Sequence, residues 1–107
     1  MAWLYLVLAG ISEIGWPIGF KMASLAQKTS GHVFWITFAV AMMGLSGLLL
    51  YLAQREIPIG TAYIIWTGIG GISTFLIGIW FFGDASSTMR YFGALLVLVG
   101  LGVLRFF

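Results

Sequence analysis

The sequence predicts an all-α integral membrane protein with four transmembrane helices, and three observations support this fold class. The 107 residues are 62% hydrophobic and only 7% charged, whereas soluble domains carry about 25% charged residues. The mean hydropathy is +1.10. The charges also leave long uncharged stretches, since residues 29–54, 57–83 and 91–104 contain none and residues 1–20 contain only Glu13.

The uncharged stretches have the lengths of membrane spans. A helix needs about 20 residues to cross a bilayer, so this chain has room for four or five spans. We expect one transmembrane domain over residues 1–107, with helices at about 3–22, 32–53, 59–82 and 87–106. We also expect the first span to be retained rather than removed as a signal peptide, because Glu13 interrupts it and no basic segment precedes it.

Short polar segments separate the expected spans. They lie at residues 27–31, 54–58 and 83–87. Within the third segment, the residues from Asp84 to Ser87 supply side chains that commonly cap the start of a helix.

Several classes of function are excluded or disfavoured by composition. The chain contains no cysteine, which excludes disulfides, thiolate metal sites and thiol catalysis. It shows no pairing of nucleophile and base, no metal cluster and no cofactor motif, so we expect neither an enzyme nor a bound cofactor or metal. Five scattered basic residues and a net charge of +2 give no nucleic-acid footprint. The expected surroundings are the lipid bilayer of a cell membrane.

The basic residues do not define one orientation in the membrane. With four spans, one side holds Arg55 and Arg105, and the other holds Lys21, Lys28 and Arg90. Orientation usually follows an excess of Lys and Arg on the cytoplasmic side. Two interpretations stay open: the counts are too small to decide, or the chain inserts in both orientations so that oppositely oriented copies pair.

Glu13 is the candidate functional residue, because it is the only acid inside an apolar span. An acid at this depth is costly and indicates a functional site by default. Its charge is removed by a proton or balanced by a bound cation, so protons and cations would compete for the same oxygen atoms. That competition is the minimum requirement for proton-coupled antiport. The alternative is a structural acid that hydrogen-bonds to a neighbouring helix.

The helical neighbours of Glu13 favour the functional interpretation. Small residues at Ala9 and Gly10 leave space on its face, and Trp16 offers an aromatic wall that attracts cations. Pro17 removes the backbone bond to the Glu13 carbonyl, so we expect a kink or a free acceptor there. Ser12 points about 100° away around the helix and serves Glu13 only if the helix bends.

The third span carries a second polar and aromatic stripe. Tyr63, Trp66, Thr67 and Gly70 follow helical spacing. Tyrosine and tryptophan often anchor helices at the membrane boundary, but Trp66 and Thr67 lie too deep for that role, so we expect the stripe to line the site. The glycines of residues 68–71, including Gly68 and Gly70, are candidates for a hinge.

The fourth span is expected to mediate helix packing. Gly93 and Gly100 lie seven residues apart, and such small residues let two apolar helices approach closely. Dimerisation is the simplest use of this surface. Gly15 and Gly19 form a G-x-x-x-G pair in the first span, which is weaker support in a chain with 15 glycines.

Taken together, these residues resemble the small multidrug resistance transporters over essentially the whole chain. The resemblance rests on Glu13 followed by Lys21, on Ser46 in the second span, and on a third-span signature. The signature residues are Pro58, Gly60, Ala62, Tyr63, Trp66, Gly68 and Gly70. The resemblance implies an antiparallel homodimer whose two Glu13 residues share one site for protons or a cation, with hinge motion of the third span and dimer contacts through the fourth.

Within that family the chain is most similar to the guanidinium exporters. The resemblance assigns substrate and proton binding to Glu13, and orientation of Glu13 to Trp16 and Ser46. It assigns the lining and gating of the pocket to Tyr63 and Trp66. Ser12, Pro17 and Ile64 depart from the family pattern, and we expect these departures to change the shape of the pocket or of its portal.

Three hypotheses from different classes follow. The first is a proton-coupled exporter of guanidinium or guanidinyl compounds, with export of quaternary ammonium and other lipophilic cations as the alternative. The second is a subunit that moves lipids or lipid-linked carriers across the bilayer. The third is a structural membrane subunit in which Glu13 only pairs with a partner helix.

Overall fold

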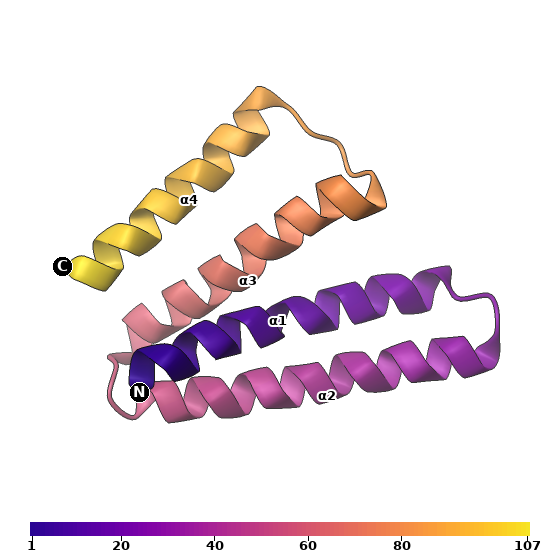
Figure 1. Ribbon diagram of the computed structural model, residues 1–107, viewed down its shortest axis with the longest axis horizontal. Helices are drawn as coiled ribbons and strands as arrows, with labels where there is room; N and C mark the ends of the chain where they lie inside the picture. Colours follow the sequence, from indigo (N-terminus) through magenta and orange to yellow (C-terminus); the bar gives the residue numbers. More distant parts are fainter.

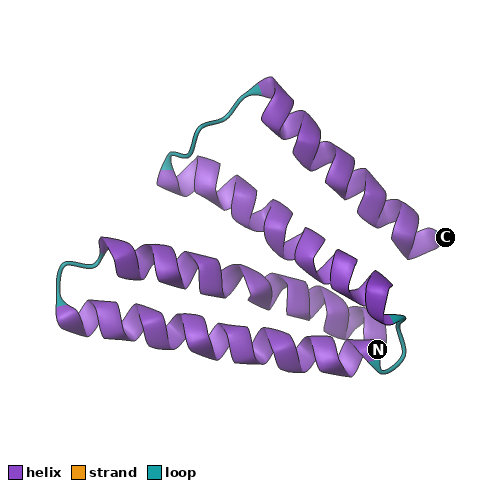
Figure 2. Cartoon of the chain, turned by 180° about the vertical axis from the view of Figure 1, so that it is seen from behind, coloured by secondary structure: helices purple, strands orange, loops and turns teal.

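The computed structural model describes residues 1–107 and contains four α-helices and no strands (Figures 1 and 2). The helices are α1 (Ala2–Leu25), α2 (Thr29–Gln54), α3 (Ile59–Phe82) and α4 (Thr88–Phe106). All four are long and apolar enough to cross a membrane. The all-α class with four spans is therefore confirmed.

The first connection is shorter than the sequence indicated. Residues 29–31 were expected in a loop but begin α2, and α1 continues to Leu25. A side chain ties the two helix ends together, because Nδ1 of His32 lies 3.0 Å from the Ala23 carbonyl oxygen. The prediction of a five-residue loop was wrong because the turn is closed by this tertiary contact, which no local turn signal reveals.

The third connection combines a left-handed turn with a helix cap. α3 ends at Gly83, whose φ of 71° is a conformation that glycine adopts without strain. α4 begins after Ser87, whose hydroxyl accepts a hydrogen bond from the Arg90 backbone N–H at 3.2 Å. Of the expected segment from Asp84 to Ser87, Ser87 is therefore the capping residue.

The helices are packed unequally. α1 lies between α2 and α3 and contacts α2 along much of its length, whereas α4 is the outermost helix and packs on α3 (Figure 1). α1 and α3 lie close at the N-terminal end of the chain and diverge toward the other end, as both ribbon views show (Figures 1 and 2). This divergence leaves space between the C-terminal halves of α1 and α3.

Glycines set the close contact between α1 and α2. A Cβ atom added at Gly19 would lie 2.9 Å from the Cβ and 3.2 Å from the Cα of Ala39. At Gly15 it would lie 2.7 Å from the Cγ of Met42. The G-x-x-x-G pair of the first span thus packs α1 on α2 within the chain.

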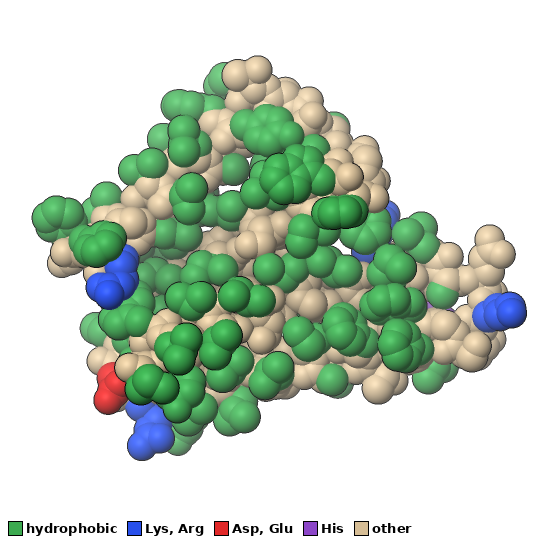
Figure 3. Space-filling view, viewed as in Figure 1, with side chains coloured by type: hydrophobic (Ala, Val, Ile, Leu, Met, Phe, Trp, Pro, Cys, Tyr) green, Lys and Arg blue, Asp and Glu red, His purple; other side chains and the backbone are tan.

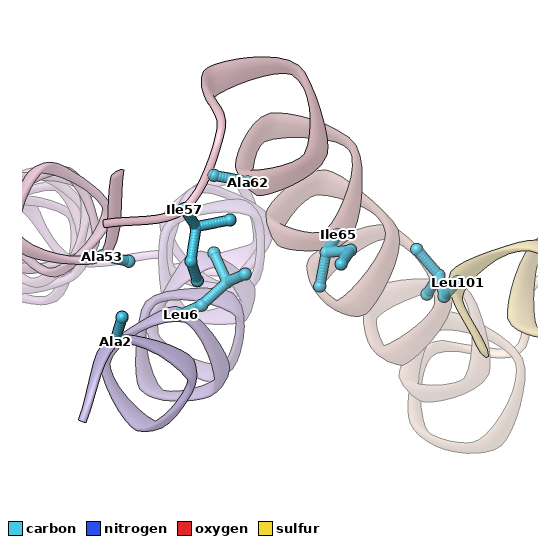
Figure 4. Close-up of a cluster of buried hydrophobic side chains, with 7 residues drawn as sticks. All are labelled: Ala2, Leu6, Ala53, Ile57, Ala62, Ile65 and Leu101. Atoms are coloured by element: carbon cyan, nitrogen blue, oxygen red, sulfur yellow. The ribbon is translucent and has the colours of Figure 1, made fainter. Parts of the chain in front are cut away.

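A small apolar cluster holds the N-terminal ends of α1 and α3 to the second connection. Leu6 of α1 and Ile57 point toward each other, and Ile65 of α3 extends the cluster toward Leu101 of α4 (Figure 4). Most other apolar side chains face outward and cover the molecule between its charged ends (Figure 3). Outward apolar faces are expected for helices whose solvent is lipid.

We expect Gly19→Ala to lower the free energy of unfolding by about 1–3 kcal/mol, the typical cost of overpacking. The added methyl group meets the backbone of α2, which cannot shift cheaply. Thermal unfolding in detergent micelles measures the change. Gly44→Ala is the matched control, because a Cβ at Gly44 meets nothing within 4 Å. Equal destabilisation by both variants would contradict the assigned packing.

Candidate functional site

Glu13 lies near the middle of α1 on the side that faces α3. Its side chain packs against Gly70, where an added Cβ would lie 2.7 Å from the Glu13 Cγ and 2.9 Å from its Cβ. Gly70 is buried, while Glu13 is partly buried. The Glu13 side chain can therefore pack against α3 only because residue 70 is glycine.

Both carboxylate oxygens of Glu13 accept a hydrogen bond. The indole Nε1 of Trp16 donates to Oε1 at 2.6 Å, from the next turn of the same helix. The hydroxyl of Ser46, on α2, lies 2.9 Å from Oε2. Both donors are neutral, and no Lys or Arg forms an ion pair with Glu13. Hydrogen bonds from neutral donors therefore set the orientation of the Glu13 carboxyl group, and no basic side chain of the chain pairs with it.

Ser46 connects three helices through one fully buried hydroxyl. It accepts a hydrogen bond from the indole Nε1 of Trp66 at 2.8 Å. It also lies 2.8 Å from the Ala9 carbonyl oxygen and 2.9 Å from Oε2 of Glu13. A serine hydroxyl has one proton, so it donates to one of these two acceptors at a time. The group therefore links α3 to α1 through α2.

A cavity of about 270 Å³ opens beside Glu13, between α1 and α3. Trp16 forms an aromatic wall that is extended by Phe20, whose ring centroid lies 5.9 Å away in an edge-to-face arrangement. The lining residues are Glu13, Trp16, Pro17, Thr67, Gly70, Gly71 and Thr74. The cavity thus combines one carboxylate with an aromatic face and two threonines.

Only part of the stripe predicted in the third span, which comprises Tyr63, Trp66, Thr67 and Gly70, lines this cavity. Thr67 and Gly70 line it, and Trp66 reaches Glu13 through Ser46. Tyr63 is 56% exposed and does not line the cavity. Its ring packs on Trp66, with centroids 5.5 Å apart, and its carbonyl accepts a hydrogen bond from the Thr67 hydroxyl at 2.8 Å. Gly68 faces α4 instead of the cavity.

Gly68 and Ser12 have roles other than direct contact with the acid. A Cβ at Gly68 would lie 2.6 Å from Cδ2 of Leu101, so this glycine lets α4 approach α3. Ser12 is buried but forms no hydrogen bond with Glu13. α1 is one continuous helix through Pro17, which also lines the cavity. Ser12 therefore stays on a different face of α1 from the acid.

Sequence reasoning missed Thr74. This residue lines the Glu13 cavity although it lies two turns beyond Thr67. The signal was present, because seven residues correspond to about two helical turns and place both threonines on one face of α3. No cluster of three or more potential metal ligands is brought together anywhere in residues 1–107.

Comparison with known proteins places the chain in a family. A family profile described as "Small Multidrug Resistance protein" matches residues 1–98. The chain belongs to the small multidrug resistance family. Similar relatives are each called a guanidinium exporter: those of Yersinia pseudotuberculosis (36% identical), Escherichia coli K12 (33%) and Salmonella typhimurium (34%). These matches cover 94% of the chain and 92–93% of the relatives.

This small multidrug resistance protein is therefore a membrane transporter and not an enzyme. Its four apolar helices and its bacterial relatives make it a multi-pass protein of a prokaryotic plasma membrane. The family resemblance read from Glu13, Ser46 and the third-span signature is confirmed.

Substituting Gly70 should disturb the acid more than substituting the adjacent glycine. Gly70→Ala places a methyl group against Glu13, and we expect it to cost about 1–3 kcal/mol of folding stability and to shift the indole N–H resonance of Trp16 in NMR spectra. Gly71→Ala is the matched control, since it lines the same cavity but meets nothing within 4 Å. Identical spectra and stabilities for the two variants would contradict the contact.

Proposed function

We propose that this protein is a proton-coupled antiporter that exports guanidinium or guanidinyl compounds. The observation that carries the proposal is the state of Glu13. Its oxygens are oriented by Trp16 and Ser46, but no cation of the chain neutralises it, and it borders a cavity. In an apolar surrounding such a carboxylate takes up either a proton or a cation. Exchange of one for the other couples the two movements.

The chemistry of guanidinium matches this carboxylate. Guanidinium is planar and donates two parallel N–H bonds to the two oxygens of a carboxylate. Each oxygen of Glu13 accepts one bond in the chain and has further acceptor capacity. The Trp16 face beside it stabilises a weakly hydrated cation. The names of the similar relatives, all guanidinium exporters, support the same substrate.

A quaternary ammonium ion is the alternative substrate. It has no N–H group and would bind Glu13 through charge and the aromatic wall alone. It would leave the oriented oxygen atoms of Glu13 without new hydrogen bonds. The two substrate classes therefore differ in one respect: guanidinium has N–H groups that donate hydrogen bonds to Glu13, and a quaternary ammonium ion has none.

We propose that the transporting unit is an antiparallel homodimer. α4 buries only Leu101, and added Cβ atoms at Gly93 and Gly100 meet nothing within 4 Å. Small residues on such a free face allow a second copy to approach closely. The near balance of basic residues on the two sides fits insertion in both orientations.

Alternating access is then an exchange between two conformations of the dimer. Movement of α3 about its glycines, among them Gly68 and Gly70, would open the Glu13 cavity to one side and then to the other. Coupling requires that the dimer changes conformation readily only when Glu13 holds a proton or a cation.

Transport in proteoliposomes tests the role of Glu13. With an imposed proton gradient, the wild-type protein is expected to move guanidinium, and Glu13→Gln to fall to the rate of protein-free vesicles, because glutamine neither releases a proton nor attracts a cation. Glu56→Gln is the control, since Glu56 is an exposed acid in the second connection. Undiminished transport by Glu13→Gln would refute the mechanism.

The same vesicles separate the alternatives. Transport of a bulky tetraalkylammonium ion without guanidinium would assign the protein to the quaternary ammonium exporters. No transport of either cation would favour a structural or lipid-moving subunit.

Competition at Glu13 also predicts a pH dependence of binding. As the pH falls, a proton occupies the carboxylate and the cation must displace it, so the dissociation constant for guanidinium should rise. For one proton displaced per cation the rise approaches about tenfold per pH unit. Isothermal titration of the detergent-solubilised protein measures it. A dissociation constant that is independent of pH would exclude a shared site.

A further inference from the structure

A second cleft is lined by residues from the C-terminal halves of α1 and α3 and by Asp84. The two helices diverge in this region (Figure 1). The volume of the cleft is about 170 Å³. Pro17 and Thr74 line both spaces, so the cleft continues the Glu13 cavity toward the end of the helices. Its two charged lining residues are Lys21 of α1 and Asp84, which follows α3.

Asp84 is held against α3 by the turn that ends this helix. The left-handed conformation of Gly83 reverses the chain, and the Asp84 backbone N–H donates to the Gly78 carbonyl at 3.0 Å. Gly78 has no side chain, and a Cβ atom there would collide with Oδ2 of Asp84. The glycine therefore lets the carboxylate lie directly on the helix surface at the cleft.

Lys21 and Asp84 line the same cleft without forming an ion pair. The other lining residues carry no charge: Pro17, Ile18, Thr74, Ile77, Gly78 and Phe82. A cation that approaches Glu13 by this route is repelled by Lys21 and attracted by Asp84. We call this cleft the mouth of the path to Glu13. Without the carboxylate of Asp84, Lys21 would give the mouth a positive charge, which is unfavourable for a cationic substrate.

We propose that Asp84 is an outer binding group for the transported cation, which neutralises Lys21 and holds the cation at the mouth before it reaches Glu13. This inference rests on the proposed function. Phe82 adds an aromatic ring to the lining of the cleft, and Thr74 lines both the cleft and the Glu13 cavity. The path therefore has two acidic binding groups, of which Asp84 is the outer and Glu13 the inner one.

The test measures guanidinium transport in proteoliposomes at low and high ionic strength. Asp84→Asn keeps the shape of the side chain and removes its charge. We expect its KM to rise about two- to fivefold at low salt, the size typical of exposed charge pairs, with the maximal rate unchanged. High salt should abolish the difference. Glu56→Gln, at the opposite end of α3, is the matched control and should leave KM unchanged.

Lys21→Gln should change KM in the opposite direction, because it removes the repulsion at the mouth. The double variant Lys21→Gln with Asp84→Asn should return KM close to that of the wild type. A purely structural role of Asp84 at the end of α3 would give neither the salt dependence nor this compensation.

The outcomes separate this inference from the proposed function. An Asp84→Asn variant with the KM of the wild type, or with the same change as Glu56→Gln, would overturn the outer binding group alone. A wild-type protein that moves neither guanidinium nor tetraethylammonium would overturn the proposed function and the outer binding group together. Loss of transport in Glu13→Gln, combined with a change of KM only in Asp84→Asn, supports both.

Discussion

The hydroxyl of Ser46 is the point at which three helices meet. It accepts a hydrogen bond from Trp66 of α3 and lies within 2.8 Å of the Ala9 carbonyl and 2.9 Å of Glu13, both in α1. In a membrane no water replaces a lost partner, so these polar groups must satisfy one another. The position of the acid, and therefore the chemistry of the site, depends on this shared group.

Such short polar contacts require helices that approach closely, and glycine provides the distance. Gly15 and Gly19 bring α1 against α2, and Gly70 brings α3 against the side chain of Glu13. A methyl group at any of these positions would overlap its neighbour. Gly15, Gly19 and Gly70 are therefore explained in this conformation by close packing.

The unequal packing of the bundle determines where its open spaces lie. α1 is held along α2, but it diverges from α3, and both the Glu13 cavity and the cleft beyond it lie in that divergence. Oriented neutral donors leave the charge of Glu13 available, while Lys21 and Asp84 face the same opening. α4 contributes no residue to the Glu13 cavity or to the cleft, and a Cβ added at Gly93 or Gly100 would meet nothing within 4 Å.

The four spans could be located from the sequence, because nearly all charges and the polar segments lie at the ends of the apolar stretches, and Glu13 stood out as the one acid inside a span. The sequence also located Trp16, since residues three apart share a helix face. The packing of the helices was needed to show that Ser46 contacts this acid, that Trp66 reaches it through Ser46, and that Asp84 shares a cleft with Lys21. It also showed that neither Tyr63 nor Ser12 forms a hydrogen bond with the acid. Periodicity relates residues within one helix, whereas the rotation of one helix against another is set by packing along its whole length.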